Sequence, residues 1–220
     1  MVRAIKFELY KLIKEPFLWG TIAITLIVNF VMTAGTKTTL DGFLQKSFIT
    51  SIIASLYAAF NVGNDFENGR ALYTVLSGNS RAVIGISKDA SAIFATEILV
   101  LLFPCTEILR HKDDWDFRLK CVVVISYAVL GMFLGVLGMS MACLFRNAGL
   151  AIVAVIIFHL CTLFLMNNEI VSDIAINIFP IGIVKLLVEG TAQLYSGIIF
   201  GGWIFLLTIA AITNLKYLDL

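Results

Sequence analysis

The chain has 220 residues, of which 60% are hydrophobic and 14% are charged, and its formal net charge is +1. Soluble domains hold about 45–50% apolar and about 25% charged residues. A water-soluble fold of this size cannot cover so much apolar side chain with so few polar residues. The composition therefore excludes a water-soluble enzyme and a disordered chain, and the near-zero charge excludes a nucleic-acid binder. It predicts an all-α integral membrane protein.

Residues 1–16 follow a pattern typical of a helix that lies in the membrane interface. Apolar residues recur at three- and four-residue steps, with charged residues between them. The apolar positions are Val2, Ile5, Leu9 and Leu12 or Ile13, and the charged ones are Lys6, Glu8, Lys11 and Lys14. Such a helix places its basic face on anionic headgroups, and Pro16 ends it before the first span. The alternative is a solvated, positively charged flank.

Six apolar segments are long enough to cross a membrane, which takes about 20 residues of helix. They are residues 17–34, 43 or 48–63, 90–109, 121–145, 148–166 and 198–215. The apolar stretch 174–188 is broken by Pro180 and Lys185, so residues 167–196 are expected to form an extracellular re-entrant or interface-lying hairpin. Residues 1–220 are expected to form a single transmembrane domain.

Positive charge before the first span sets the expected orientation. Arg3, Lys6, Lys11 and Lys14 all precede it, and such clusters stay on the cytoplasmic side. With six spans, both termini are therefore expected to be cytoplasmic.

No catalytic or metal-binding motif is present. The sequence contains no GxxxxGK[ST] phosphate loop, no HExxH zinc helix and no GxSxG elbow. The cysteines at 105, 121, 143 and 161 have no metal-ligand spacing, although Cys105 and Cys121 both lie near the expected outer face, where they can pair. We therefore expect no enzyme activity and no metal in this chain.

Three polar residues inside the expected spans are candidates for a translocation pathway: Asn29, Glu97 and His159. A carboxylate at mid-bilayer costs about 2.5–3.5 kcal/mol, so Glu97 should face protein or water. Glu97 and His159 can equally be neutral groups that bond a neighbouring helix. An ion-coupled secondary transporter or channel that uses these two residues is the alternative to the function given below.

Small residues form a stripe along the fourth span, at Gly131, Gly135, Gly138 and Ala142. Small side chains let another helix approach closely, which favours packing inside a membrane. The stripe predicts a helix contact, either within the chain or between two subunits.

Residues 64–81 lie between the second and third spans and combine a polar start with an amphipathic middle. Leu72, Tyr73 and Leu76 recur at helical spacing. Gly78 and Asn79 are typical of a helix end, and Ser80 can cap the helix that follows. The pattern predicts a short helix on the cytoplasmic face.

Here the chain resembles the permease subunits of type 2 ABC exporters. That family's cytoplasmic segment is similar in order and spacing to Glu67, Gly69, Leu72, Leu76, Ser80, Arg81, Ile84 and Lys88. Residues 8–12, Glu-Leu-Tyr-Lys-Leu, resemble its interface helix. Arg70, where threonine is common, and Gly78-Asn79, in place of the usual proline, depart from the pattern and leave the subfamily open.

The resemblance implies that residues 64–81 are a coupling helix, seated in a groove of a separate ATPase subunit that carries ATP and Mg²⁺. No cofactor is then expected in this chain. A second permease chain, identical or different, would complete a pathway between the two. Arg81 and Lys88 would anchor the start of the third span at the inner headgroups. The full set of coupling residues is Asp65, Phe66, Glu67, Gly69, Arg70, Leu72, Tyr73, Leu76, Ser80, Arg81 and Lys88.

The chain has no large extracellular domain. In this layout it is similar to the permeases that export bacitracin, lantibiotics and other membrane-active peptides or give resistance to them. By this analogy at the level of the fold, the resemblance implies an amphiphilic peptide substrate, contact with membrane lipid and a place in a bacterial plasma membrane.

Overall fold

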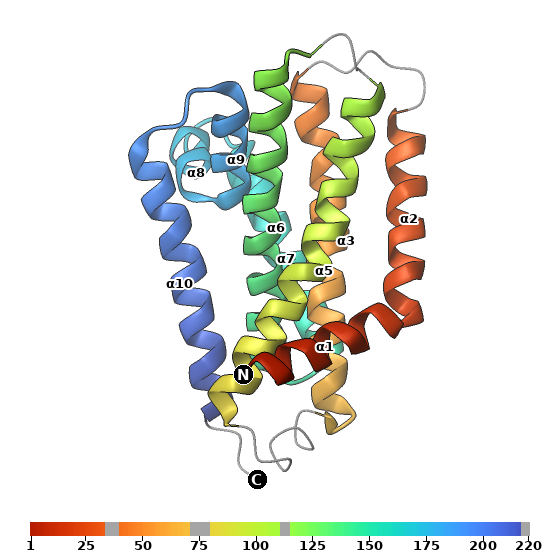
Figure 1. Ribbon diagram of the computed structural model, residues 1–220. Coiled ribbons are helices and arrows are strands. Elements are labelled where there is room, and N and C mark those ends of the chain that lie inside the picture. The colour runs from red at the N-terminus through yellow and green to blue at the C-terminus, as the bar shows by residue number, and fades with distance from the viewer. Residues whose placement is uncertain (34–39, 71–79, 111–114, 217–220) are drawn as a thin grey trace.

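The computed structural model in Figure 1 describes residues 1–33, 40–70, 80–110 and 115–216, and the regular structure in these ranges is entirely α-helical, as the composition predicts. The helices are α1 (Val2–Lys14), α2 (Pro16–Thr33), α3 (Leu40–Glu67), α5 (Arg81–Arg110), α6 (Phe117–Phe145), α7 (Ala148–Met166), α8 (Ser172–Ile178), α9 (Pro180–Glu189) and α10 (Leu194–Lys216).

The long helices form a bundle with roughly parallel axes, and the short helices lie at the two ends of this bundle. Figure 1 shows α2, α3, α5, α6, α7 and α10 side by side, with α1 lying across one end and α8 and α9 at the other. Helix α6 packs against α3, α5, α7, α9 and α10, so it forms the centre of the bundle. We call the two ends the α1 end and the hairpin end.

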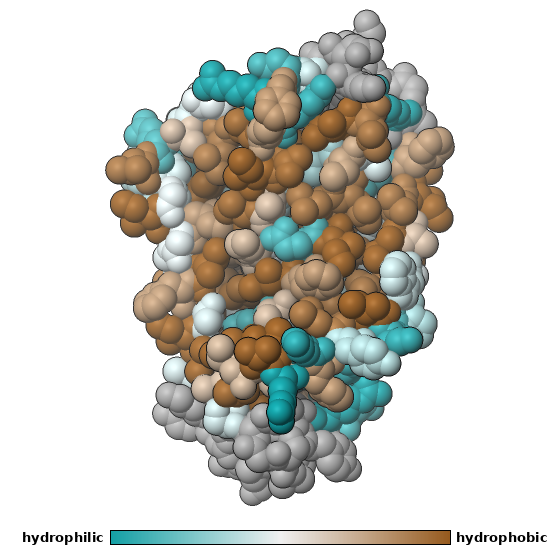
Figure 2. Space-filling model, viewed as in Figure 1, coloured by the Kyte–Doolittle hydropathy of each residue, from teal (hydrophilic) through white to brown (hydrophobic). Residues whose placement is uncertain are grey.

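Four helical segments are long and apolar enough to cross a membrane: Ala82–Arg110, Phe117–Phe145, Ala148–Met166 and Leu194–Asn214. Helices α1 and α2 meet at a bend of 60°, and if they are counted together as one broken span, there are five candidate spans. Figure 2 shows hydrophobic side chains over the middle of the molecule and hydrophilic ones gathered at both ends. Neither α2 by itself nor α3 is among these segments, so the expected six spans stay a prediction.

The break between the first two helices confirms a separate N-terminal helix. Helix α1 ends at Lys14, Glu15 is extended, and Pro16 begins α2. Part of the expected apolar face packs on the bundle: Leu12 is buried and Ile5 and Leu9 are partly buried, while Val2 and Ile13 are exposed. Glu8 is buried on the same side. The acid is buried because it has a cationic partner there, described below.

The glycine stripe of α6 lies inside the chain. A Cβ added to Gly135 would lie 2.7 Å from the Cα atom of Ile93 on α5, and one on Gly138 would lie 2.6 Å from the Cβ atom of Ala58 on α3. Gly131 faces the carboxyl group of Glu97, and Ala142 is fully buried. The stripe therefore lets two helices of the same chain, α5 and α3, pack closely on α6.

Residues 167–196 contain a helical hairpin. Pro180 begins α9 after the extended residue Phe179, so the chain breaks where the sequence predicts. The Trp203 indole of α10 donates to the carbonyl of Ile178 at 2.9 Å, which ties the hairpin to the last long helix. All four cysteines are free, so Cys105 and Cys121 are not joined.

Candidate functional site: a buried ion-pair cluster

Four charged side chains from three helices meet at the α1 end. Asp65 of α3 accepts hydrogen bonds from the Lys11 ammonium of α1 at 2.6 Å and from the Lys88 ammonium of α5 at 2.5 Å. Lys88 also lies 3.6 Å from Glu8 of α1. We call these four residues the ion-pair cluster. It joins segments that are 23 and 54 residues apart in the sequence.

Most of the cluster is shielded from water. Lys88 is 2% exposed, Asp65 3% and Glu8 5%. A charge is stable at such a position only when it is paired and hydrogen-bonded. Two carboxylates face two ammonium groups, so the cluster is neutral as a unit. Removal of one member leaves an uncompensated buried charge, which typically costs about 3–5 kcal/mol.

Asp65 carries its negative charge at neutral pH. Burial alone would raise the pKa of Asp65, but the ammonium groups of Lys88 and Lys11 outweigh it and hold that pKa below its ordinary value. The cluster is therefore ionic rather than a set of neutral groups.

Further polar groups extend the cluster toward the segment in which the coupling helix was predicted. The Arg70 guanidinium lies 3.8 Å from Asp65, directly before residues 71–79. On the other side, the Tyr57 hydroxyl donates to Glu15 at 3.4 Å. Burial raises the pKa of Glu15, against the opposing effect of Lys11.

A second junction holds the start of α7. The Glu67 carboxylate accepts a hydrogen bond of 2.9 Å from the backbone N–H of Ala148, the first residue of that helix. A negative group is favourable there because it faces the positive end of the helix dipole. One turn earlier, a Cβ on Gly63 would lie 2.6 Å from the Cα atom of Ala148. The last turn of α3 therefore positions the α6–α7 turn.

The structure places the first members of the predicted coupling set. Residues 64–67 continue α3 rather than begin a new helix, and Gly69, with φ +65°, follows its end. Asp65 is buried and faces two lysines. Lys88 is buried too, with its ammonium group against Asp65 and Glu8.

The other coupling residues have mixed positions. Ser80 accepts from the backbone N–H of Val83 at 3.3 Å and so caps α5, as predicted. Phe66 packs against the core and Arg70 is exposed. Arg81 is the first residue of α5. Leu72, Tyr73 and Leu76 lie outside the described residues.

The three pathway candidates are not brought together. Asn29 of α2 accepts from the Thr50 hydroxyl of α3 at 2.8 Å. His159 of α7 is fully buried, with its Nε2 atom 2.7 Å from the Ser55 hydroxyl of α3. Glu97 of α5 lies against α6. Each lies at a different helix contact, and both interpretations given above for Glu97 and His159 stay predictions.

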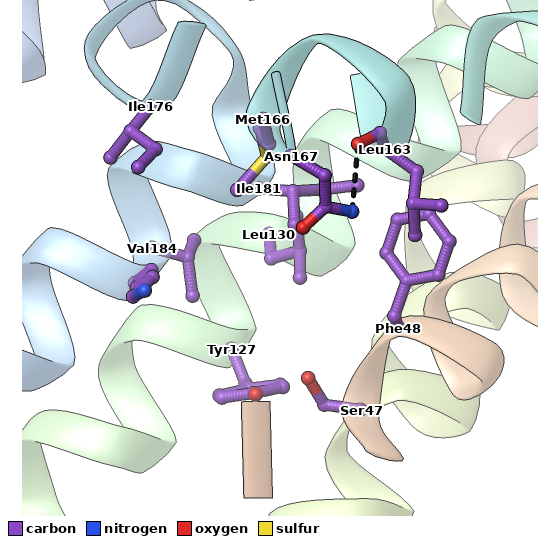
Figure 3. Close-up of a pocket in the computed structure, with 11 residues that line it drawn as sticks. Ser47, Phe48, Tyr127, Leu130, Leu163, Met166, Asn167, Ile176, Ile181 and Val184 are labelled. Atoms are coloured by element: carbon purple, nitrogen blue, oxygen red, sulfur yellow. Dashed lines mark hydrogen bonds between the residues drawn. The ribbon is translucent and has the colours of Figure 1, made fainter. Parts of the chain in front are cut away.

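A cavity of about 410 Å³ lies near the hairpin end, between α3, α6, α7 and the α8–α9 hairpin. Figure 3 shows Tyr127 and Leu130 on one side of it and Ile176, Ile181 and Val184 on another. None of the three pathway candidates lines it. Apart from Lys185, which interrupts an apolar stretch, the sequence did not single out these lining residues, because they come from three stretches that are far apart in the chain, 47–48, 127–130 and 163–185.

Together these features define a class: an all-helical protein with four to five candidate membrane spans and a buried ionic junction at one end. Within the described ranges, no group of three or more His, Cys, Asp or Glu residues can hold a metal ion. The chain matches no protein-family model and no curated protein. The particular activity is therefore argued from the site.

Proposed function

We propose that this chain is the permease subunit of a type 2 ABC exporter, driven by a separate subunit that binds and hydrolyses ATP with Mg²⁺. The proposal includes six spans, with α2 and α3 as the first two, and both termini on the cytoplasmic side of a bacterial plasma membrane. A second permease chain completes the pathway, and the cargo is an amphiphile such as a membrane-active peptide.

The order of the helices supports this proposal. An amphipathic helix lies across one end, and long helices follow in alternating directions (Figure 1). Exposed basic residues of α1, namely Arg3, Lys6 and Lys14, gather at the end where residues 70–80 connect α3 to α5. Positive charge of this kind is typical of a cytoplasmic end.

The ion-pair cluster is the observation that carries the proposal. Asp65 lies at the start of the predicted coupling segment, residues 64–81, and it binds α1 and α5 to α3. Because separation of buried partners is costly, a push on that segment moves α1, α3 and α5 together. Through Glu67 the same push reaches α7. The cluster thus provides a rigid route from a docking helix into the bundle.

Co-purification of an ATPase tests the proposal. The tagged chain is extracted from its native membranes in mild detergent, and vanadate-sensitive ATP hydrolysis and co-eluting subunits are measured. The double variant Leu72→Asp, Leu76→Asp places charge on the apolar side of the predicted coupling helix. We expect it to lose most of the ATPase while the chain itself still elutes as a folded species.

Ile170→Asp is the matched control, since Ile170 is 89% exposed and lies near the hairpin end. It adds charge to an apolar position but is expected to keep the ATPase. The proposal fails if no ATPase co-elutes with the wild type, or if the double variant and the control retain equal hydrolysis.

A further inference from the structure

We propose that the cavity at the hairpin end is a binding site for an amphiphile with one apolar chain and one anionic headgroup. This inference does not rest on the proposed function, because the site lies within one chain and its occupancy is measurable without ATP.

The polarity of the cavity changes from its inner end to its mouth. Tyr127, Leu130 and Val184 at the inner end are each at most 2% exposed. At the mouth, Leu163 is 42% exposed, and the side chain of Lys185 is 34% exposed. A ligand would therefore place its apolar part inward and its polar head outward, where water still reaches it.

The inner end combines two hydroxyl groups with an apolar wall. The side chains of Ser47 and Tyr127 lie side by side there (Figure 3), and both residues are buried. Leu130, Ile181 and Val184 supply the apolar wall beside them.

The mouth favours a negative charge. Lys185 is the one basic side chain among the described residues that line the cavity. Its contact with Glu189 is 3.7 Å long and partly exposed on both sides, and such a pair is worth only about 0–1 kcal/mol. An anionic headgroup can replace it. The Asn167 amide uses one N–H on the Leu163 carbonyl, and its second N–H is available as a donor.

The cavity is preformed rather than a gap under a loose segment. Gly182 of α9 packs directly on the backbone of Ile176 of α8, and hydrogen bonds from Tyr195 and Trp203 of α10 hold the hairpin in place. A volume of about 410 Å³ falls in the range of about 300–1,000 Å³ typical of small-molecule sites. It suits one acyl chain and not a polypeptide.

A fluorescent fatty acid tests the site. The full chain is placed in nanodiscs of phosphatidylcholine and titrated with dansyl-labelled undecanoic acid. Lys185→Gln is expected to weaken binding about tenfold, as the loss of one charge-assisted contact predicts. Lys120→Gln, which removes a cation at the same end outside the cavity, is the control and is expected to bind like the wild type. Leu130→Trp fills the inner end and is expected to abolish binding.

Further probes define the headgroup. Dansyl-labelled undecylamine is expected to bind far more weakly than the acid. Competition by palmitate or by lysophosphatidylglycerol shows whether the preferred head is a carboxylate or a phosphate, and lysophosphatidylcholine is expected to compete poorly. The proposal fails if the acid and the amine bind equally well, or if Lys185→Gln and Lys185→Glu, both at a partly exposed position that tolerates change, leave the affinity for the acid unaltered.

Discussion

The two ends of the bundle differ in how their helices are held together. At the α1 end, three helices converge on charges that are buried and mutually neutralised, and only a small cavity of about 10 Å³ lies among them. At the hairpin end, the helices part around a cavity, and the hairpin is held by hydrogen bonds between neutral groups. The first end ties three helices together by charge, and the second leaves space between its helices.

The first prediction tests whether the ion-pair cluster is what holds α1 against the bundle. Asp65→Asn keeps the shape of the side chain but leaves two lysines facing one acid. We expect it to lower the free energy of unfolding by about 3–5 kcal/mol, because a buried ammonium group loses its partner. Titration of the detergent-solubilised chain with sodium dodecyl sulfate, followed by helical circular dichroism, measures this.

The double variant Asp65→Asn, Lys11→Gln restores a neutral cluster of Glu8 and Lys88. It is expected to lose less stability than the sum of the two single changes, because residues that share contacts are not additive. Lys6→Gln, an exposed change on the same helix, is expected to have almost no effect. Equal losses for Asp65→Asn and Lys6→Gln would show that the cluster does not stabilise the junction.

The hairpin end is expected to respond to shape rather than to charge. A Cβ on Gly182 would clash with the backbone of Ile176, so Gly182→Ala forces the two short helices apart. Overpacking of this kind costs about 1–3 kcal/mol. Gly201→Ala on α10, where a Cβ has nothing within 4 Å, is the control. The same titration measures both, and a loss in the control as large as in Gly182→Ala contradicts the proposed close packing.

Local features were predictable from the sequence. Pro16 separates α1 from α2, Pro180 begins α9, and Ser80 caps α5. In each case a residue's own backbone chemistry or a contact three residues away decides the outcome. The small residues of α6 were likewise visible as positions of close approach.

The partners of the charged residues were not predictable in the same way. Asp65 and Lys88 both lie where an apolar stretch meets the α1 end, and that shared position was the available signal for their pairing. It does not tell whether such charges point outward to water or inward to each other. The outcome depends on how α3 and α5 are rotated about their axes. That rotation places Ala58 and Ile93 against Gly138 and Gly135 of α6, where only glycine leaves room for them. The cavity is formed by three stretches far apart in the chain, 47–48, 127–130 and 163–185, so no local pattern in the sequence indicates it.

The Glu67 junction sharpens the comparison, because it is a hydrogen bond between a carboxylate and a backbone N–H that is only partly buried. Glu67→Gln keeps an oxygen that can accept from Ala148 but removes the negative charge at the start of α7. We expect a loss of about 0.3–1 kcal/mol, the usual value of a charge at a helix terminus, measured by the same titration. The loss should shrink in high salt, since exposed electrostatic contacts are screened, whereas the loss caused by Asp65→Asn should not. If both variants respond to salt alike, burial does not distinguish the two contacts, and the α1 end is held by surface charge rather than by a shielded ionic core.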